Sequence, residues 1–433
     1  MQDLVVLDSG KLNVRIALLI AIVAAIVFGW FAIRWQLGDM FANLTQLNDE
    51  NAAGIADAAI NLAPSDPTAF RLAALSSADP AITIKMFEQA VRTAPNDYRW
   101  RIELGRAYEQ DGQTGRAESE IKKAVDLAPS YASVHWHLGN FYLRRERNDE
   151  AIAELKKATR NSDIYRDQVF SLVWDKFNKD PRQVEDLAGD EPDSVARVTY
   201  FFAAHGKAQD SLRNWNKLSD GDKADNFLIA KSIAEGLYIQ RHFPQSLEFA
   251  RQLGIDTDAQ PETVTNPSFE KAFSESVDSR FGWQVFRNDP RLDIALDAKV
   301  KHEGNGSLRA LFRSYVKSDL SNILQTIVVV PNKKYRLSFW VRTENLKSAG
   351  PPLIDVVNAN DGKLIIKSRP FASGTSDWQE MAVEFTTPEN CDGISIRTSR
   401  SFCGEDCPVS GTLWYDDFAI SREEATNIAY SEP

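Results

Sequence analysis

Hydrophobic and polar residues follow three different patterns along this chain of 433 residues. An unbroken apolar run comes first, and a long region with the period of amphipathic helices follows it. Beyond a polar stretch after Gly254, short segments alternate between apolar and polar residues, as β-strands do. These patterns predict a multidomain protein with an N-terminal apolar helix, an all-α region and an all-β region.

The apolar run extends from Ile16 to Ile33 and contains 18 uncharged residues. It forms about 27 Å of helix, which is close to the thickness of a hydrocarbon core. Lys11 and Arg15 precede the run and Arg34 follows it. We predict a transmembrane helix with a cytoplasmic N-terminus and with the rest of the chain outside. A cleaved signal peptide is the alternative, but no small-x-small cleavage site follows the run.

A spacing of 34 residues recurs in the helical region. One series of large apolar residues with this spacing is Phe87, Ile121 and Leu155. A parallel series of small residues is Ala90, Ala124 and Ala158. This period is typical of helical hairpins that stack side by side, because each hairpin buries its apolar face only against its neighbours. Two clear copies supply the predicted packing residues Leu104, Gly105, Tyr108, Ala117, Leu138, Gly139, Tyr142 and Ala151.

These two copies resemble the tetratricopeptide repeat family. The resemblance implies a right-handed superhelix whose concave face binds peptides or partner proteins. An earlier hairpin is expected to begin near Ala52, just past the membrane segment. His135 and His137 invite a metal interpretation, but residues two apart on a helix point to different faces. We therefore expect them to be surface or groove histidines.

The C-terminal region contains seven candidate strands separated by Gly, Asn and Pro turns. They are Ser307–Arg313, Ile323–Val330, Tyr335–Arg342, Leu353–Asn358, Glu380–Thr386, Ile394–Arg400 and Thr412–Ile420. Their spacing predicts an antiparallel β-sandwich.

Several short motifs in this region carry a second resemblance. In order they are Asn266-Pro267-Ser268-Phe269-Glu270, Gly282-Trp283, Gly304-Asn305-Gly306-Ser307-Leu308, the Tyr335–Arg342 strand, Trp378, Phe385 and Trp414-Tyr415-Asp416-Asp417-Phe418. Together they resemble jelly-roll carbohydrate-binding modules of the galactose-binding-like architecture. The resemblance implies a structural Ca²⁺ held by Glu270, a carbonyl near Gly304, and Asp416 or Asp417. The alternative is that these acids are solvated turn residues.

Strand alternation predicts a possible sugar-binding face. In Tyr335–Arg342 the apolar positions face the core, so Arg336, Trp340 and Arg342 share the outer face. If the neighbouring strands contribute Arg309 and Arg397, this face is an arginine-rich patch around an aromatic ring. Arginine pairs with carboxylates, so we predict a site for an acidic polysaccharide. The alternative is that Trp340 packs under a loop and the arginines only solubilise the face.

All three cysteines lie near the C-terminus. Cys403 and Cys407 flank a short loop and can form a disulfide, which would leave Cys391 free. Zinc binding is the competing interpretation, but no histidine is near this pair.

The net charge of −11 and the lack of a long basic run argue against a nucleic-acid partner. We predict a non-catalytic protein of the bacterial inner membrane whose bulk is periplasmic. Its repeats would bind a protein partner and its sandwich a polysaccharide, in exopolysaccharide or cell-wall assembly. A pure protein-interaction scaffold is the alternative. A glycoside hydrolase is disfavoured, because adjacent Asp416 and Asp417 are expected to point to opposite faces of a strand.

The predicted domain boundaries follow from the changes of pattern. They are a tail at 1–15, the transmembrane helix at 16–35, the helical repeat domain at 36–254, a linker at 255–265, the β-sandwich at 266–422 and a second tail at 423–433.

Overall fold

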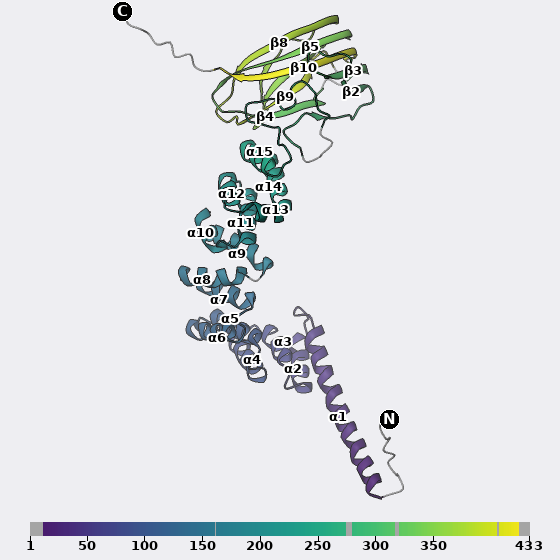
Figure 1. Ribbon diagram of the computed structural model, residues 1–433. Helices are drawn as coiled ribbons and strands as arrows, with labels where there is room; N and C mark the ends of the chain where they lie inside the picture. Colours follow the sequence, from purple (N-terminus) through teal and green to yellow (C-terminus); the bar gives the residue numbers. More distant parts are fainter. Residues whose placement is uncertain (1–11, 161, 274–278, 317–319, 405–406, 424–433) are drawn as a thin grey trace, which may run out of the picture. The chain divides into compact units, whose positions relative to one another are not determined.

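A computed structural model describes residues 12–423 of the chain, except residues 161, 274–278, 317–319 and 405–406 (Figure 1). The chain divides into two compact units, residues 1–187 and residues 188–433. Helices 188–253, which the sequence assigns to one repeat array, therefore group with the β-sandwich.

The described part of the first unit is entirely helical. Its helices are α1 (Leu12–Leu44), α2 (Ala52–Leu62), α3 (Pro67–Leu75), α4 (Pro80–Thr93), α5 (Tyr98–Gln110), α6 (Thr114–Leu127), α7 (Ala132–Arg144), α8 (Asn148–Arg160), α9 (Asp163–Lys176) and α10 (Pro181–Ala188).

Helix α1 is the one described helix that is long and apolar enough to cross a membrane, although a signal sequence would pass the same test. It continues beyond the predicted end at Trp35, because no proline interrupts the following residues. Gly38 and Ala42 near its end are buried. A Cβ atom at Gly38 would lie 2.6 Å from that of Ala63, so α1 packs closely on α2. The first hairpin is therefore formed by α1 itself.

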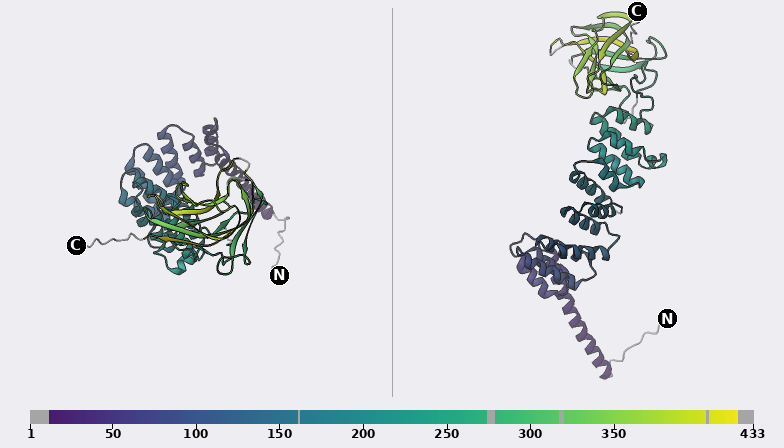
Figure 2. Two further views of the ribbon diagram at one scale, coloured as in Figure 1. Left: turned by 90° about the horizontal axis from the view of Figure 1, so that it is seen from above. Right: turned by 90° about the vertical axis from the view of Figure 1, so that its left-hand side faces the viewer.

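The helices from α3 to α8 form successive antiparallel pairs that stack on one another (Figure 2). Helices α3, α4 and α5 are capped by the residues just before them, Asp66, Asp79 and Asp97. The side chain of each aspartate accepts a hydrogen bond from a backbone N–H two residues further on. Gly105 and Gly139 let the two helices of a pair approach. A Cβ atom there would lie 2.6 Å from Cγ1 of Ile121 and 2.7 Å from Cγ of Leu155, respectively.

All eight predicted packing residues are buried. The period of 34 residues therefore reflects equivalent contacts in successive hairpins.

The second unit contains five helices and two sheets among its described residues. The helices are α11 (Pro192–Ala204), α12 (Ala208–Trp215), α13 (Asp220–Asp225), α14 (Phe227–Ile239) and α15 (Phe243–Gln252). The strands are β1 (Gln284–Val285), β2 (Leu292–Asp297), β3 (Ser307–Tyr315), β4 (Ile323–Val328), β5 (Lys334–Ser348), β6 (Pro352–Asn358), β7 (Leu364–Lys367), β8 (Gly374–Thr386), β9 (Gly393–Arg400) and β10 (Val409–Arg422).

The strands form two antiparallel five-stranded sheets. Sheet A has the order β1-β4-β9-β6-β7 and sheet B the order β2-β3-β10-β5-β8. One apolar core lies between them and includes Phe269, Trp283, Phe339 and Phe418. All seven predicted strands are present. The short strands β1 and β7 and the strand β2 were not predicted, because their sequences lack a long alternating pattern.

Helices α14 and α15 pack on the outer face of sheet A. Phe243 and Val328 share one apolar cluster. A Cβ atom at Gly393 would collide with the ring of Phe243, so this glycine lets the ring lie on β9. The hydroxyl of Tyr238 lies 2.8 Å from that of Thr326. This end of the face is therefore covered by the protein itself.

The segment 255–265, predicted as a linker, is held against the sandwich. The backbone N–H of Glu262 donates to the carbonyl of Val328 at 2.8 Å. The side-chain amide of Gln325 accepts from the backbone N–H of Thr265 at 2.8 Å and donates to its carbonyl at 2.9 Å. The segment therefore belongs to the second unit rather than acting as a flexible spacer.

We predict that Gly139→Ala destabilises the repeats by about 1–3 kcal/mol, because its Cβ overlaps Leu155. The matched control is Gly115→Ala in α6, where a Cβ has open space and helix propensity favours alanine by up to about 1 kcal/mol. Hydrogen exchange of α7 and α8 in the full chain measures the first effect, and hydrogen exchange of α6 measures the second. Equal protection in the two variants would contradict the close-packing argument.

Candidate functional site

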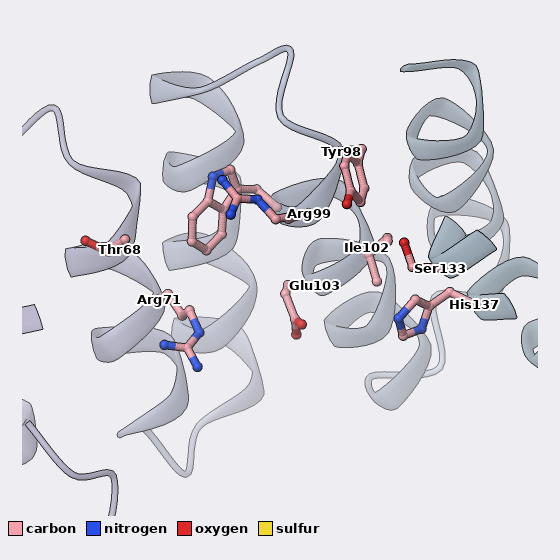
Figure 3. Close-up of a pocket in the computed structure, with 9 residues that line it drawn as sticks. Thr68, Arg71, Tyr98, Arg99, Ile102, Glu103, Ser133 and His137 are labelled. Atoms are coloured by element: carbon pink, nitrogen blue, oxygen red, sulfur yellow. The ribbon is translucent and has the colours of Figure 1, made fainter. Parts of the chain in front are cut away.

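The first candidate site is a hollow of about 440 Å³ in the first unit (Figure 3). Side chains from α3, α5 and α7 project into it, among them Arg71, Tyr98, Arg99, Glu103, Ser133 and His137. These are the faces of the repeat helices that do not pack against their hairpin partners. Such a surface can hold an extended peptide.

Arginine side chains contribute to this hollow, which Arg71 and Arg99 line. Arg99 donates to Asp97, with Nη2 at 2.6 Å from Oδ2. A second hollow of about 650 Å³, on α5 and α7, is lined by Arg106, Glu109, Gln110, Arg144 and Arg145. Both hollows therefore present guanidinium groups, which bind carboxylates in a bidentate geometry.

The two histidines of α7 have opposite environments. His135 is buried, with Nδ1 at 2.6 Å from Oε2 of Glu154, and this hydrogen bond raises the pKa of His135. Burial lowers the pKa of His137 to about 4, and the charges of Arg106 and Arg144 lower it further. The pair does not share one ligand, so the structure places no joint metal site here.

The outer face of sheet B carries Arg309, Arg336 and Arg342, as predicted from strand alternation. Each faces an acid of its own sheet. Arg309 Nη2 lies 3.0 Å from Asp293, and Arg342 Nη1 lies 3.4 Å from Asp377. Arg336 lies near glutamates of β8. The patch is therefore largely neutralised within the protein.

Trp340 lies on the same face but under a loop. The ring of His302 stacks on it with centroids 3.8 Å apart and an interplanar angle of 16°. The indole N–H of Trp378 donates to the carbonyl of Lys301 at 3.1 Å and holds the loop in place. The geometry corresponds to the alternative prediction, in which Trp340 packs under a loop rather than stacking on a sugar.

Arg397 does not belong to this patch, and the prediction that its strand neighbours the others is wrong. Its strand, β9, pairs with β4 and β6 in sheet A. There Arg397 Nη2 lies 3.6 Å from Asp355, and Lys367 Nζ lies 3.8 Å from the same carboxylate. Asp355 is 2% exposed. Within the described chain, Oδ1 of Asp355 and Nε of Arg397 have no hydrogen-bond partner.

Asp416 and Asp417 do not point to opposite faces, contrary to the sequence prediction. The backbone N–H of His302 donates to Asp416 Oδ2 at 2.8 Å, and its ring Nδ1 lies 2.7 Å from Asp417 Oδ2. The register of β10 against β5 shifts between Asp416 and Ala419, and Asp417 has φ of 49°. This bulge interrupts the alternation on which the prediction rested.

The predicted calcium ligands are engaged in separate contacts: Glu270 with the backbone at Gly304 and Asn305, and Asp416 and Asp417 with His302. Glu270 accepts a hydrogen bond from the backbone N–H of Asn305 at 2.7 Å, next to Gly304. Asp417 also accepts from the hydroxyl of Ser268. Donors of the chain thus engage the carboxylates, and no three His, Cys, Asp or Glu side chains among the described residues are grouped to hold a metal. Structural calcium remains a prediction.

The structure joins Cys403 and Cys407 in a disulfide, with Cα atoms 5.6 Å apart. Cys391 is a free, buried thiol, and burial raises its pKa to about 12. A thiol of this kind is inert.

Sequence reasoning missed some residues that shape these sites. Glu103 and His137 are separated by the repeat period of 34, as are Arg99 and Ser133, so the spacing could have identified the groove. His302 gave no such signal, because nothing local shows that its loop folds over sheet B.

We predict that Asp416 makes stability depend on pH. Burial raises the pKa of its carboxyl to about 6, whereas the unfolded chain has a value near 4. The folded state therefore binds the proton more tightly, and stability falls as pH rises from about 4 to about 6. Over this pH range the free energy of unfolding of the wild type should fall by up to about 3 kcal/mol relative to that of Asp416→Asn, with a chelator in both buffers. Urea unfolding at each pH measures the difference, and a difference independent of pH would contradict the prediction.

Two family models match the chain. One, described as a carbohydrate binding domain, matches residues 261–399. The other, described as a tetratricopeptide repeat, matches residues 72–132 and 104–163.

Individual proteins match only parts of the chain. A protein O-mannosyl-transferase of Caenorhabditis elegans is 32% identical over 73 residues, and this match spans 17% of the present chain and 11% of that protein. The solved MamA of Desulfovibrio magneticus RS-1 is 27% identical, with 29% of this chain and 72% of that chain covered and a TM-score of 0.26. A solved carbohydrate-binding module of family 4 is 14% identical, with 37% and 99% covered and a TM-score of 0.28.

The two family models agree with the two folds described above. The chain therefore combines tetratricopeptide repeats at 72–163 with a carbohydrate binding domain at 261–399, behind one helix that is long and apolar enough to cross a membrane.

Proposed function

We propose that this is a non-catalytic, membrane-anchored envelope protein that binds a partner protein through its repeats and a polysaccharide through its sandwich. It would act in exopolysaccharide or cell-wall assembly at the bacterial inner membrane, with its bulk in the periplasm. The apolar part of α1, exposed throughout and flanked by Arg15 and Arg34, supports the anchor.

The observation that carries the sugar-binding part is the pair Asp355 and Arg397 on the outer face of sheet A. Buried polar atoms without a hydrogen-bond partner are costly, by about 1–3 kcal/mol each. A sugar hydroxyl can donate to Asp355 Oδ1 and accept from Arg397 Nε at the same time, and thereby satisfy both atoms. Lys367, whose side chain is 45% exposed, is long enough to move aside and admit the hydroxyl.

Sheet B is the weaker candidate for the sugar site. Its arginines already face acids, and His302 covers Trp340. A glycan there would have to displace these contacts before forming its own. We therefore place the proposed site on sheet A.

A pure protein-interaction scaffold is the second candidate function. It is favoured by the docking of α14 and α15 on sheet A, where Phe243 and Tyr238 already occupy the end of the face around Val328 and Thr326. In that case the sandwich would serve as a platform for helices, and no polysaccharide would bind.

The sugar-binding part is tested with the full chain in nanodiscs against immobilised xylan, β-glucan and polygalacturonate. We expect binding to at least one of them. Asp355→Ala and Arg397→Ala should each weaken it by about tenfold or more, because each removes a charge-assisted hydrogen bond.

The matched control is Arg309→Ala, which removes the same kind of side chain from the opposite sheet and should retain binding. Trp340→Ala should retain binding as well. Circular dichroism verifies that all variants fold. Absence of binding to every polysaccharide would favour the scaffold function. Loss of binding in Arg309→Ala but not in Arg397→Ala would move the site to sheet B.

A further inference from the structure

Helix α1 carries a stripe of large apolar side chains along its whole length, which we call the heptad stripe. From Leu12 to Leu44, alternating steps of four and three residues reach only leucine, isoleucine, valine, methionine and one tryptophan. When the residues of α1 are sorted by heptad position, only the two positions on this stripe contain no small, polar or charged residue. They correspond to positions a and d of a coiled coil, whose period of 3.5 residues keeps one face of a helix against a partner helix.

The last part of the heptad stripe lies beyond the predicted membrane span. Leu37, Met40 and Leu44 follow Arg34 and are 39%, 39% and 73% exposed within the described chain. Leu44 lies about 16 Å beyond Ile33 along α1, whereas the headgroup region on one side of a bilayer is about 5–8 Å thick. Lipid therefore does not reach the end of the stripe.

The packing of α2 shows where the part of α1 in water begins. The guanidinium of Arg34 donates to the carbonyl of Asn61 near the C-terminal end of α2. Helix α2 packs beside the end of α1 and carries the exposed acid Asp57, which is costly to place among lipid chains. The residues of α1 that follow Arg34 therefore lie in water.

The heptad stripe and α2 occupy opposite sides of α1. Gly38 approaches the carbonyl of Ala59 in α2, and Ala42 shares an apolar cluster with Ala59. At 3.6 residues per turn, Met40 lies about 160° around the helix from both Gly38 and Ala42. The first hairpin therefore leaves the stripe uncovered, and a contiguous row of apolar side chains in water is typical of an interaction surface.

A second copy of α1 matches the heptad stripe in period, depth and charge. Identical helices anchored in one membrane run parallel, so equal positions meet at equal depth. A charge on the seam would then face its own copy, but the three charged residues of α1, Arg15, Arg34 and Asp39, all lie off the stripe. At about 60–120 Å² for each side chain, its ten positions offer about 600–1,200 Å² of contact per chain, and a standard interface needs about 800 Å².

We infer that two copies of the chain pair in parallel through the heptad stripe of α1, with Leu37, Met40 and Leu44 forming the end of the seam that lies in water. The inference rests on the proposed function only in that α1 spans a membrane. It adds a partner, which is the chain itself. Two tethered sandwiches can then bind one polysaccharide more tightly than either sandwich alone, because the second binding step is intramolecular.

Cysteine crosslinking of the full chain in membranes tests the seam. Leu37→Cys, Met40→Cys and Leu44→Cys place a thiol on the stripe, and Trp35→Cys and Asp39→Cys place one on other faces of α1. Helix axes about 8–10 Å apart bring facing Cα atoms within the limit of about 7 Å for a disulfide and keep back-facing ones beyond about 10 Å. An oxidant should therefore crosslink the first three variants at least about tenfold more than the other two.

The wild type gives the background of the crosslinking assay, because its free thiol, Cys391, is buried. A second measurement uses energy transfer between copies labelled at the C-terminus and mixed in liposomes at low density. Leu37→Glu/Leu44→Glu should lower the paired fraction at least about tenfold, because like charges then meet in the seam. The matched control is Ile82→Glu on α4, which changes an exposed apolar residue away from the stripe and should pair as the wild type does. Hydrogen exchange of α2 verifies that the first hairpin stays folded.

Several outcomes would overturn the inference. They are equal crosslinking on and off the stripe, unchanged energy transfer in the double glutamate variant, and crosslinked products with a mass other than twice that of the chain. Recovery of a shortened chain in the soluble fraction would refute the membrane anchor, and with it the pairing. Polysaccharide binding through Asp355 and Arg397 is measured separately, so its loss with retained crosslinking leaves the inference standing.

Discussion

The close approach of helices at Gly105 and Gly139 is the contact on which the repeat surface depends. At each position a branched side chain, Ile121 or Leu155, occupies the space that a Cβ atom would need. Because the contact recurs after 34 residues, α5 and α7 are positioned alike, and Glu103 and His137 occupy equivalent places on the exposed face. The groove is thus a consequence of packing on the other side of the same helices.

In the sandwich, contacts within the protein decide which outer surface remains available. His302 covers Trp340 on sheet B, and helices α14 and α15 cover one end of sheet A through Phe243. The arginines of sheet B face acids of their own sheet. Around Asp355 and Arg397 a carboxylate oxygen and a guanidinium N–H stay buried without a hydrogen-bond partner in the described chain, whereas on sheet B the atoms without a partner are Nε of Arg309 and Nε of Arg342. Sheet A therefore offers both a missing donor and a missing acceptor at one place, and sheet B only missing acceptors.

Local sequence patterns predict the helices and strands that have a strong hydrophobic period. They do not predict contacts between segments that are distant in sequence. Helix α2 and the seven longer strands follow from local patterns, as do the buried residues at Leu104 and Leu138. Strand order does not follow from alternation, so Arg397 was assigned to the wrong sheet. The bulge at Asp417 and the loop over Trp340 depend on contacts more than 30 residues away in sequence. No local pattern encodes them.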